Sequence, residues 1–186
     1  MDFSVTMVIL LVDIAVFTIY VADVLMRFGI PVNLSITYYR YERTHRRLGI
    51  LFPSLLIFIC CTTIPIWFIT SWYASAWGRY FVEMPVIAEV CLLAVAFSAR
   101  YKRRKNLIYF HYTCAIIASV CAVVWLCLVA WQFSLMWLRI GLLLGFVATG
   151  VITNTLKKCS LFWLELTAFY AVFFTLFFIY FVPFHV

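Results

Sequence analysis

Charged residues are scarce in this sequence. They make up 11% of its 186 residues, while hydrophobic residues make up 67%; soluble domains carry about 25% charged residues. This shortage excludes a soluble enzyme and leaves no room for a separate soluble domain, because about six spans of ~20 apolar residues use up the chain. We therefore expect one all-α integral membrane bundle with short loops, extending over residues 1–186.

Residues that hold metals are also few. The chain has three histidines, His45, His111 and His185, and none of its seven cysteines belongs to a CxxC motif. A metal-dependent lipid hydrolase needs several histidines and an acid at one depth of the membrane. The topology below puts His185 at the opposite end of the bundle. We expect no metal site and no cofactor, and cysteines that serve as packing residues.

Six apolar runs are expected to form transmembrane helices. They cover residues 3–26, 48–69, 81–99, 106–131, 136–153 and 159–181. The N-terminus opens with an acid, Asp2, and lacks the basic stretch of a signal peptide, so we expect the first run to be kept as a span. Trp and Tyr cluster at several run ends, as in the aromatic belts of membrane proteins.

The basic residues alternate between loops. Twelve of the fourteen lie in or beside the first, third and fifth loops, and only Arg79 and Arg139 lie elsewhere. Because basic loops stay on the cytoplasmic side, both termini are expected on the non-cytoplasmic side. Orientation and anionic lipids thereby explain the net charge of +7, and nucleic acid is not an expected partner.

Small residues form stripes in two spans. Gly141, Gly145 and Thr149 recur at four-residue spacing in the fifth span, and Ala118 and Ala122 do the same in the fourth. In lipid, such stripes let two helix backbones approach closely. We expect tight packing inside the bundle. A homo-oligomer face on one stripe is the alternative, and a role as a subunit of a larger membrane complex also stays open.

Five ionisable side chains within the spans are candidates for a functional site: Asp13, Asp23, Glu89, His111 and Glu165. Each is costly in lipid unless it is paired or hydrated. At 1.5 Å per residue, Asp23, His111 and Glu165 lie within roughly 5–10 Å of the cytoplasmic interface. Asp13 is expected near the middle of the membrane, and Glu89 nearer the outer face.

The three shallow groups predict a polar pocket in the cytoplasmic leaflet. His111 and Glu165 are expected to share a hydrogen bond or a proton there. Two other arrangements are open: His111 and Glu165 as fasteners between helices, and Asp23 paired with Arg27 four residues on. The predicted pocket residues are His111, Glu165, Asp23, Ser35, Tyr38 and Tyr39.

Arginines in the adjoining loops suit an anionic headgroup. A guanidinium group binds phosphate through two parallel hydrogen bonds, and basic loops attract anionic lipids. Membrane lipids, anionic ones in particular, are therefore the expected partners. The predicted basic rim consists of Arg43, Arg46, Arg47, Arg103 and Arg104.

Three segments resemble a loose group of six-span proteins: SITYY after the first span, IYFHYTCA opening the fourth and FWLELTAFYAVFF opening the sixth. That group includes uncharacterised bacterial membrane proteins and, more distantly, the damage-regulated autophagy modulator and Sfk-like family. The resemblance marks Ser35, His111 and Glu165 as shared polar positions, and the eukaryotic relatives imply a loose link to lipid handling and membrane trafficking. We expect the chain in a bacterial inner (cytoplasmic) membrane.

Three functions fit these residues. The one we predict is a non-enzymatic lipid-interacting or accessory module. The second is a channel or proton-coupled transporter, in which Asp13, Glu89, His111 and Glu165 form a relay across the membrane. The third is a metal-free lipid hydrolase or transferase, with Ser35 as nucleophile, His111 as base and Glu165 as orienting acid.

Overall fold

The structure is a computed structural model. It describes residues 3–73, 79–100, 102, 105–132, 140–141, 144–145, 147–149, 151, 155 and 160–181. Every regular element among these residues is a helix, which confirms the predicted all-α class.

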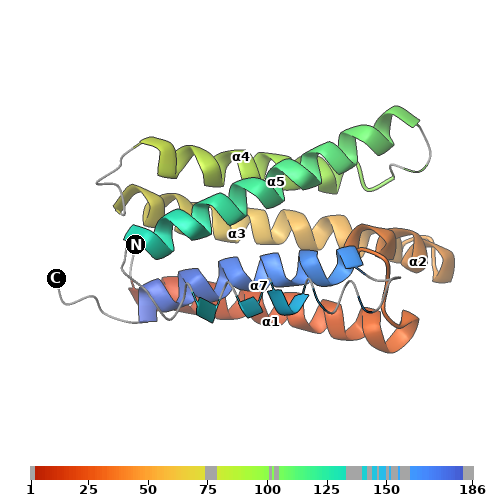
Figure 1. Ribbon diagram of the computed structural model, residues 1–186. Helices are drawn as coiled ribbons and strands as arrows, with labels where there is room; N and C mark the ends of the chain where they lie inside the picture. Colours follow the sequence, from red (N-terminus) through yellow and green to blue (C-terminus); the bar gives the residue numbers. More distant parts are fainter. Residues whose placement is uncertain are drawn as a thin grey trace.

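Long helices lie side by side, and α2 lies at one end of them (Figure 1). The long helices are α1 (Phe3–Phe28), α3 (Leu51–Tyr73), α4 (Arg79–Phe97), α5 (Lys105–Gln132) and α7 (Ser160–Phe181). Between α1 and α3 come the 3-10 turn η1 (Leu34–Ile36), α2 (Thr37–Thr44) and a second turn, η2 (Leu48–Ile50). The start of α1 and the end of α7 share the end of the bundle opposite to α2.

The long helices pack in a closed ring. α1 contacts α3 and α7, α3 contacts α4, α4 contacts α5, and α5 contacts α7. Aromatic side chains hold the ring together on its inside. Phe17 of α1 packs edge-on against Phe173 of α7, with ring centroids 5.8 Å apart, and Trp67 of α3 packs edge-on against Trp125 of α5 at 5.2 Å.

Four stretches of the described chain are long and apolar enough to cross a membrane: Ser4–Phe28, Leu48–Trp72, Asn106–Val129 and Leu161–Tyr180. They agree with four of the spans expected from the sequence. Helix α4 covers most of the expected third span but is not among the four. The expected fifth span, 136–153, lies largely outside the described residues, so the count of six stays a prediction.

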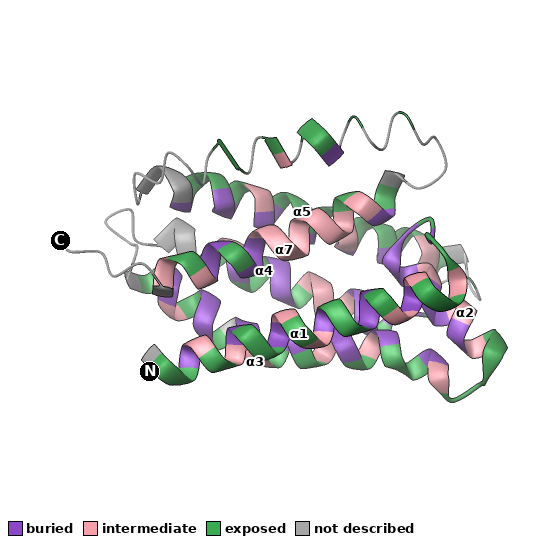
Figure 2. Ribbon diagram, turned by 90° about the horizontal axis from the view of Figure 1, so that it is seen from below, coloured by how far each residue is buried: buried purple, intermediate pink, exposed green. Residues whose placement is uncertain are grey.

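The outward sides of the helices are apolar. Ile19 on α1 and Ile116 on α5 are 68% and 62% exposed, although both lie well inside their helices. Figure 2 shows buried residues between the helices and exposed residues along their outer sides. Exposed apolar surface of this extent is rare in soluble proteins, and it suits contact with lipid tails.

The chain between α5 and α7 returns along the bundle, because α5 ends opposite to where α7 begins (Figure 1). In this stretch the Thr149 hydroxyl lies 2.8 Å from the Thr167 hydroxyl of α7. A Cβ atom added at Gly141 or Gly145 would meet no described atom within 4 Å. A side chain at either glycine would thus point into open space among the described residues, and both tight packing of this stripe and a homo-oligomer face there stay predictions.

At Gly49, η2 passes close to α2. A Cβ atom there would lie 3.1 Å from the Glu42 Cβ and 3.3 Å from the Tyr38 carbonyl oxygen. Gly49→Ala is expected to lower the thermal midpoint in detergent by about 2–4 °C, because overpacking costs about 1 kcal/mol in a chain of this size. The matched control, Gly145→Ala, adds its methyl group in open space and should keep or raise the midpoint. Equal midpoints for Gly49→Ala and the unaltered protein would contradict the close approach.

Candidate functional site

Two tyrosines of α2 hold the segment that follows α4. The Tyr38 hydroxyl accepts a hydrogen bond from Arg100 Nε, and its ring centroid lies 5.9 Å from the guanidinium carbon. The Tyr39 hydroxyl accepts from the backbone N–H of Lys102 at 2.7 Å, and its ring lies 5.2 Å from Lys102 Nζ. Each pair combines a hydrogen bond with a cation–π contact. The first and third loops are thus joined at one end of the bundle.

A groove opens beside these contacts, and we call it the basic groove. Exposed apolar side chains of η2 and α4 contribute to it; Phe97, for example, is 80% exposed. Arginines from the first and third loops lie next to these apolar groups. The lining residues are Tyr38, Arg46, Arg47, Ile50, Pro53, Ser54, Ile57, Ala96, Phe97, Ala99 and Arg100.

The arginines of the basic groove differ in their partners. Arg46 and Arg47 are exposed and form no ion pair with any residue that the structure describes. Arg100 donates to Tyr38, whose hydroxyl lies 3.4 Å from Glu42 Oε1. Arg46 and Arg47 therefore keep their hydrogen-bond donors for a ligand, while Arg100 is held in place by Tyr38.

Arg40 and Arg43, the other described arginines of the first loop, do not line this groove. Arg40 Nη1 donates to the Phe28 carbonyl oxygen at 2.8 Å, which satisfies a free carbonyl group at the C-terminus of α1. Arg43 lies beside Arg40 in a shallow hollow on another part of the surface. Arg103 and Arg104, predicted for the basic rim, lie outside the described residues.

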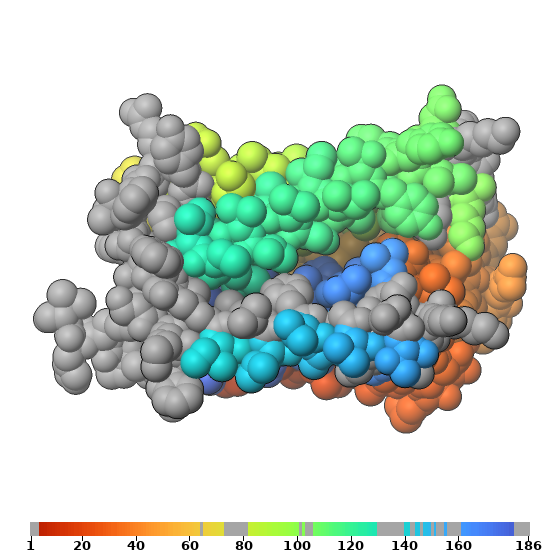
Figure 3. Space-filling model, viewed as in Figure 1, coloured from red at the N-terminus to blue at the C-terminus, as the bar shows by residue number. Residues whose placement is uncertain are grey.

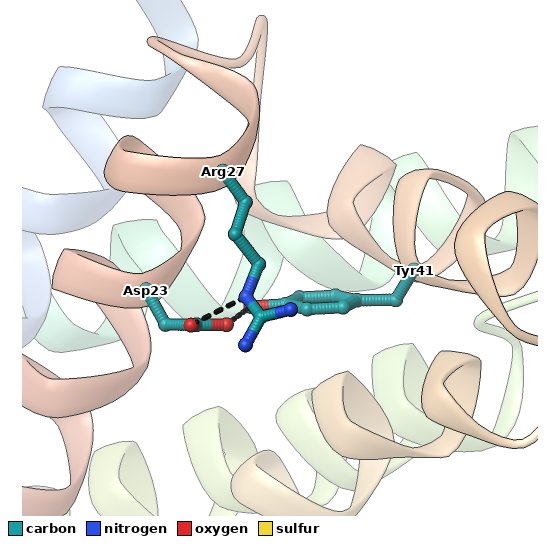
Figure 4. A network of polar contacts seen from close by, with 3 residues as sticks. All are labelled: Asp23, Arg27 and Tyr41. Atoms are coloured by element: carbon teal, nitrogen blue, oxygen red, sulfur yellow. Dashed lines mark hydrogen bonds and ion pairs between the residues drawn. The ribbon is translucent and has the colours of Figure 1, made fainter.

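Asp23 is held at the junction of α1 and α2 (Figure 4). Its Oδ1 lies 2.6 Å from Arg27 Nε, and its Oδ2 accepts a hydrogen bond from the Tyr41 hydroxyl. Burial and, after it, the bond to Asp23 raise the pKa of the Tyr41 phenol, so its hydroxyl stays protonated and donates. The expected pairing of Asp23 with Arg27 is confirmed, and both oxygens of Asp23 are occupied.

Glu165 fastens the segment after α1 to the start of α7. Its Oε2 accepts a hydrogen bond from the backbone N–H of Leu34 at 2.6 Å. The Phe162 N–H donates to the Val32 carbonyl oxygen at 3.0 Å. Ser35, which follows Leu34 in the chain, is 6% exposed. It therefore lies in a buried turn and not in a flexible loop.

His111 fastens α5 to the end of α4. The side chain is 1% exposed, and its Nδ1 lies 2.9 Å from Ser98 Oγ. In the described part of the chain, no hydrogen bond joins His111 to Glu165. The two predicted partners lie toward the same end of the bundle, but their hydrogen bonds lead to Ser98 and to Leu34.

A cavity lies inside the ring of helices, and we call it the central cavity. Its volume is about 80 Å³. Side chains of η1, α3, α4, α5 and α7 line it, with Ser35 and Glu165 among them; Ala118 and Ala122 contribute small side chains. Figure 3 shows the surface hollowed between α5 (green) and α7 (blue).

Asp13 of α1 and Glu89 of α4 both contact α3. Asp13 accepts hydrogen bonds from the Thr62 hydroxyl at 2.7 Å and the Thr63 hydroxyl at 3.2 Å. Glu89 is 2% exposed and lies against the Cys60 thiol. Cys60 is near the middle of α3, so Glu89 lies level with the middle of that helix. Its expected position nearer the outer face stays a prediction.

Ser98 and Arg100 are among the contact residues that were not predicted. Ser98 directly follows α4 and holds His111, and Arg100 holds Tyr38. In the sequence Arg100 is one of several basic residues of the third loop, and nothing distinguishes it from the others. Ser98 carries only the weak signal of a hydroxyl at the end of an apolar run.

Comparisons with known proteins assign no family. No family model matches the chain, and neither a curated protein nor a solved structure matches it. The resemblance of its SITYY, IYFHYTCA and FWLELTAFYAVFF segments to six-span membrane proteins stays a prediction.

Proposed function

We propose that this chain is a non-enzymatic integral membrane protein that binds an anionic phospholipid in the basic groove. The observation that carries the proposal is the lining of that groove, where Arg46, Arg47 and Arg100 lie next to exposed apolar side chains. A phospholipid has the matching parts. Its phosphate suits the guanidinium groups, and its acyl chains suit the apolar residues of α3 and α4.

The charge distribution supports a site in the cytoplasmic leaflet. The groove is built from the first and third loops, which the distribution of basic residues assigns to the cytoplasmic side. Anionic lipids concentrate in that leaflet. The full proposal is a six-span protein of a bacterial inner membrane with both termini on the outer side. The shared position of the start of α1 and the end of α7 supports this topology.

The hydrogen bonds of the polar residues support a non-enzymatic role. A nucleophile, its base and an orienting acid have to bond to one another in sequence. His111 is instead bonded to Ser98, and Glu165 to the backbone of Leu34. Ser35 is buried in η1, the turn that directly precedes α2. These side chains serve to join helices, so the basic groove is the better candidate for ligand binding.

Lipid retention tests the proposal. The protein is placed in nanodiscs with equal amounts of phosphatidylglycerol and phosphatidylcholine, and the lipids that stay bound after release are counted by native mass spectrometry. We expect preferential retention of phosphatidylglycerol. The double variant Arg46→Ala/Arg47→Ala should lower that retention about thirtyfold, since each basic residue at an anionic surface contributes about 1 kcal/mol.

The control removes the same charge from the other side of α2. Arg40→Ala/Arg43→Ala changes the net charge equally but leaves the lining of the basic groove intact. It should keep the preference for phosphatidylglycerol. Equal losses in the two double variants would show that bulk charge, and not the groove, retains the lipid, and the proposal would be wrong.

A further inference from the structure

We infer that the central cavity binds a hydrophobic amine, whose ammonium group pairs with Glu89. This site is separate from the basic groove and goes beyond the proposed function. It would take a ligand of opposite charge, dissolved in the membrane.

The buried Glu89 carboxyl group has an oxygen that lacks a hydrogen-bond partner among the described residues. Its side chain is 2% exposed and lines the cavity. The Cys60 thiol lies against it, but Oε2 has no hydrogen-bond partner among the described residues. A buried polar oxygen without a partner is costly, and a buried carboxylate without a cation is more so. A ligand that donates a hydrogen bond to Oε2 would remove this cost.

The surroundings of Glu89 favour a cationic donor. Among the described lining residues there is no lysine, arginine or histidine. Thr63 also lines the cavity, and its hydroxyl donates to a second acid, Asp13. Asp13 lies close enough to Glu89 for the two carboxyl groups to interact electrostatically, so two acids gather at this part of the cavity and no base of the described lining balances them there. Glu165, the other acid of the lining, is already bonded to Leu34.

The remaining walls favour an apolar body for the ligand. Phe52, Leu56, Ile59, Leu92 and Val95 are among the side chains that face the cavity. The space of about 80 Å³ is smaller than an engineered cavity of about 150 Å³ that holds benzene. It therefore takes the ammonium group and the first few carbons of an aliphatic chain, and the rest of the chain would extend out of the cavity. The hollow between α5 and α7 (Figure 3) offers such a molecule a way in from the lipid side.

Equilibrium binding of tritiated n-decylamine tests this inference. The protein is embedded in phosphatidylcholine nanodiscs, and empty nanodiscs give the background. We expect saturable binding of one decylamine per chain. Decanol, which has the same chain and no charge, should bind at least about tenfold more weakly, as expected for the loss of a charge-assisted hydrogen bond.

Variants of α4 and α5 locate the site. Glu89→Gln should weaken decylamine binding about tenfold or more, while Glu83→Gln, an exposed glutamate on the same helix, should leave it unchanged. If Glu89→Gln fails to fold, Ala118→Leu decides instead, because it fills the cavity and keeps the carboxyl group. Binding that is not saturable, equal affinity for decanol, or full binding in Glu89→Gln or Ala118→Leu would overturn the inference.

Discussion

Glu165→Leu is expected to lower the free energy of unfolding by about 2 kcal/mol. The substitution removes the acceptor of the Leu34 N–H, and Leu34 is 3% exposed, so this donor is left buried without a partner. The segment after α1 also loses its attachment to the start of α7. In a chain of this size the thermal midpoint in detergent should fall by about 4–8 °C.

Glu165→Gln is the matched control for this prediction. The amide keeps a carbonyl oxygen at the position of Oε2, so it can still accept from Leu34. Its midpoint should lie within about 2 °C of the unaltered protein. If the Gln and Leu variants are equally destabilised, the carboxylate charge matters more than the hydrogen bond, and the role of Glu165 as a fastener is contradicted.

Trp125→Ala is expected to have the largest effect on stability, about 3–5 kcal/mol. Trp125 is fully buried, its Nε1 donates to Ser71 Oγ at 2.8 Å, and its ring packs edge-on against Trp67. Truncation leaves a large hole between α3 and α5. We expect little folded protein in size-exclusion chromatography after extraction.

Two further variants test whether the loss of stability comes from the buried position of Trp125 and not from the loss of any tryptophan. Trp72→Ala removes a side chain of α3 that is 62% exposed and should change the midpoint only slightly. Trp125→Phe should cost less than Trp125→Ala, because the phenyl ring still fills much of the space between α3 and α5. Similar losses for Trp72→Ala and Trp125→Ala would contradict the packing described for this end of the bundle.

The sequence predicts the features that depend on neighbouring residues. Apolar runs gave four of the membrane-length helices nearly to the residue, because span length and hydropathy are local properties. The Asp23–Arg27 pair was also predictable, since residues four apart lie on one face of a helix. Both interpretations need only the geometry of a single helix.

The partners of the polar residues were not predictable in this way. Glu165 bonds to a residue 131 positions away, and Arg100 bonds to Tyr38, 62 positions away. These contacts depend on which helices are neighbours in the ring and on how each is rotated. The basic groove has the same origin, because η2 and the end of α4 form it together. Counting arginines by loop gives the side of the membrane but not this surface.

The first loop illustrates the difference most clearly. Three of its arginines, Arg43, Arg46 and Arg47, were predicted together as part of a basic rim, but the fold assigns them different positions. Arg40 satisfies a carbonyl group of α1, Arg43 lies beside it, and Arg46 and Arg47 line the basic groove. The short helix α2 separates them, and its existence did not follow from the sequence pattern.

Photocrosslinking of an anionic lipid tests the central claim most directly. Phosphatidylglycerol with a photoreactive group on one acyl chain is incorporated with the protein into nanodiscs, and the crosslinked peptides are identified by mass spectrometry. The basic groove predicts crosslinks within residues 50–57 and 96–100 that disappear in Arg46→Glu/Arg47→Glu and are weak with the matching phosphatidylcholine. Labelling spread evenly over the outward faces of α1, α5 and α7, with no preference for the anionic lipid, would contradict it.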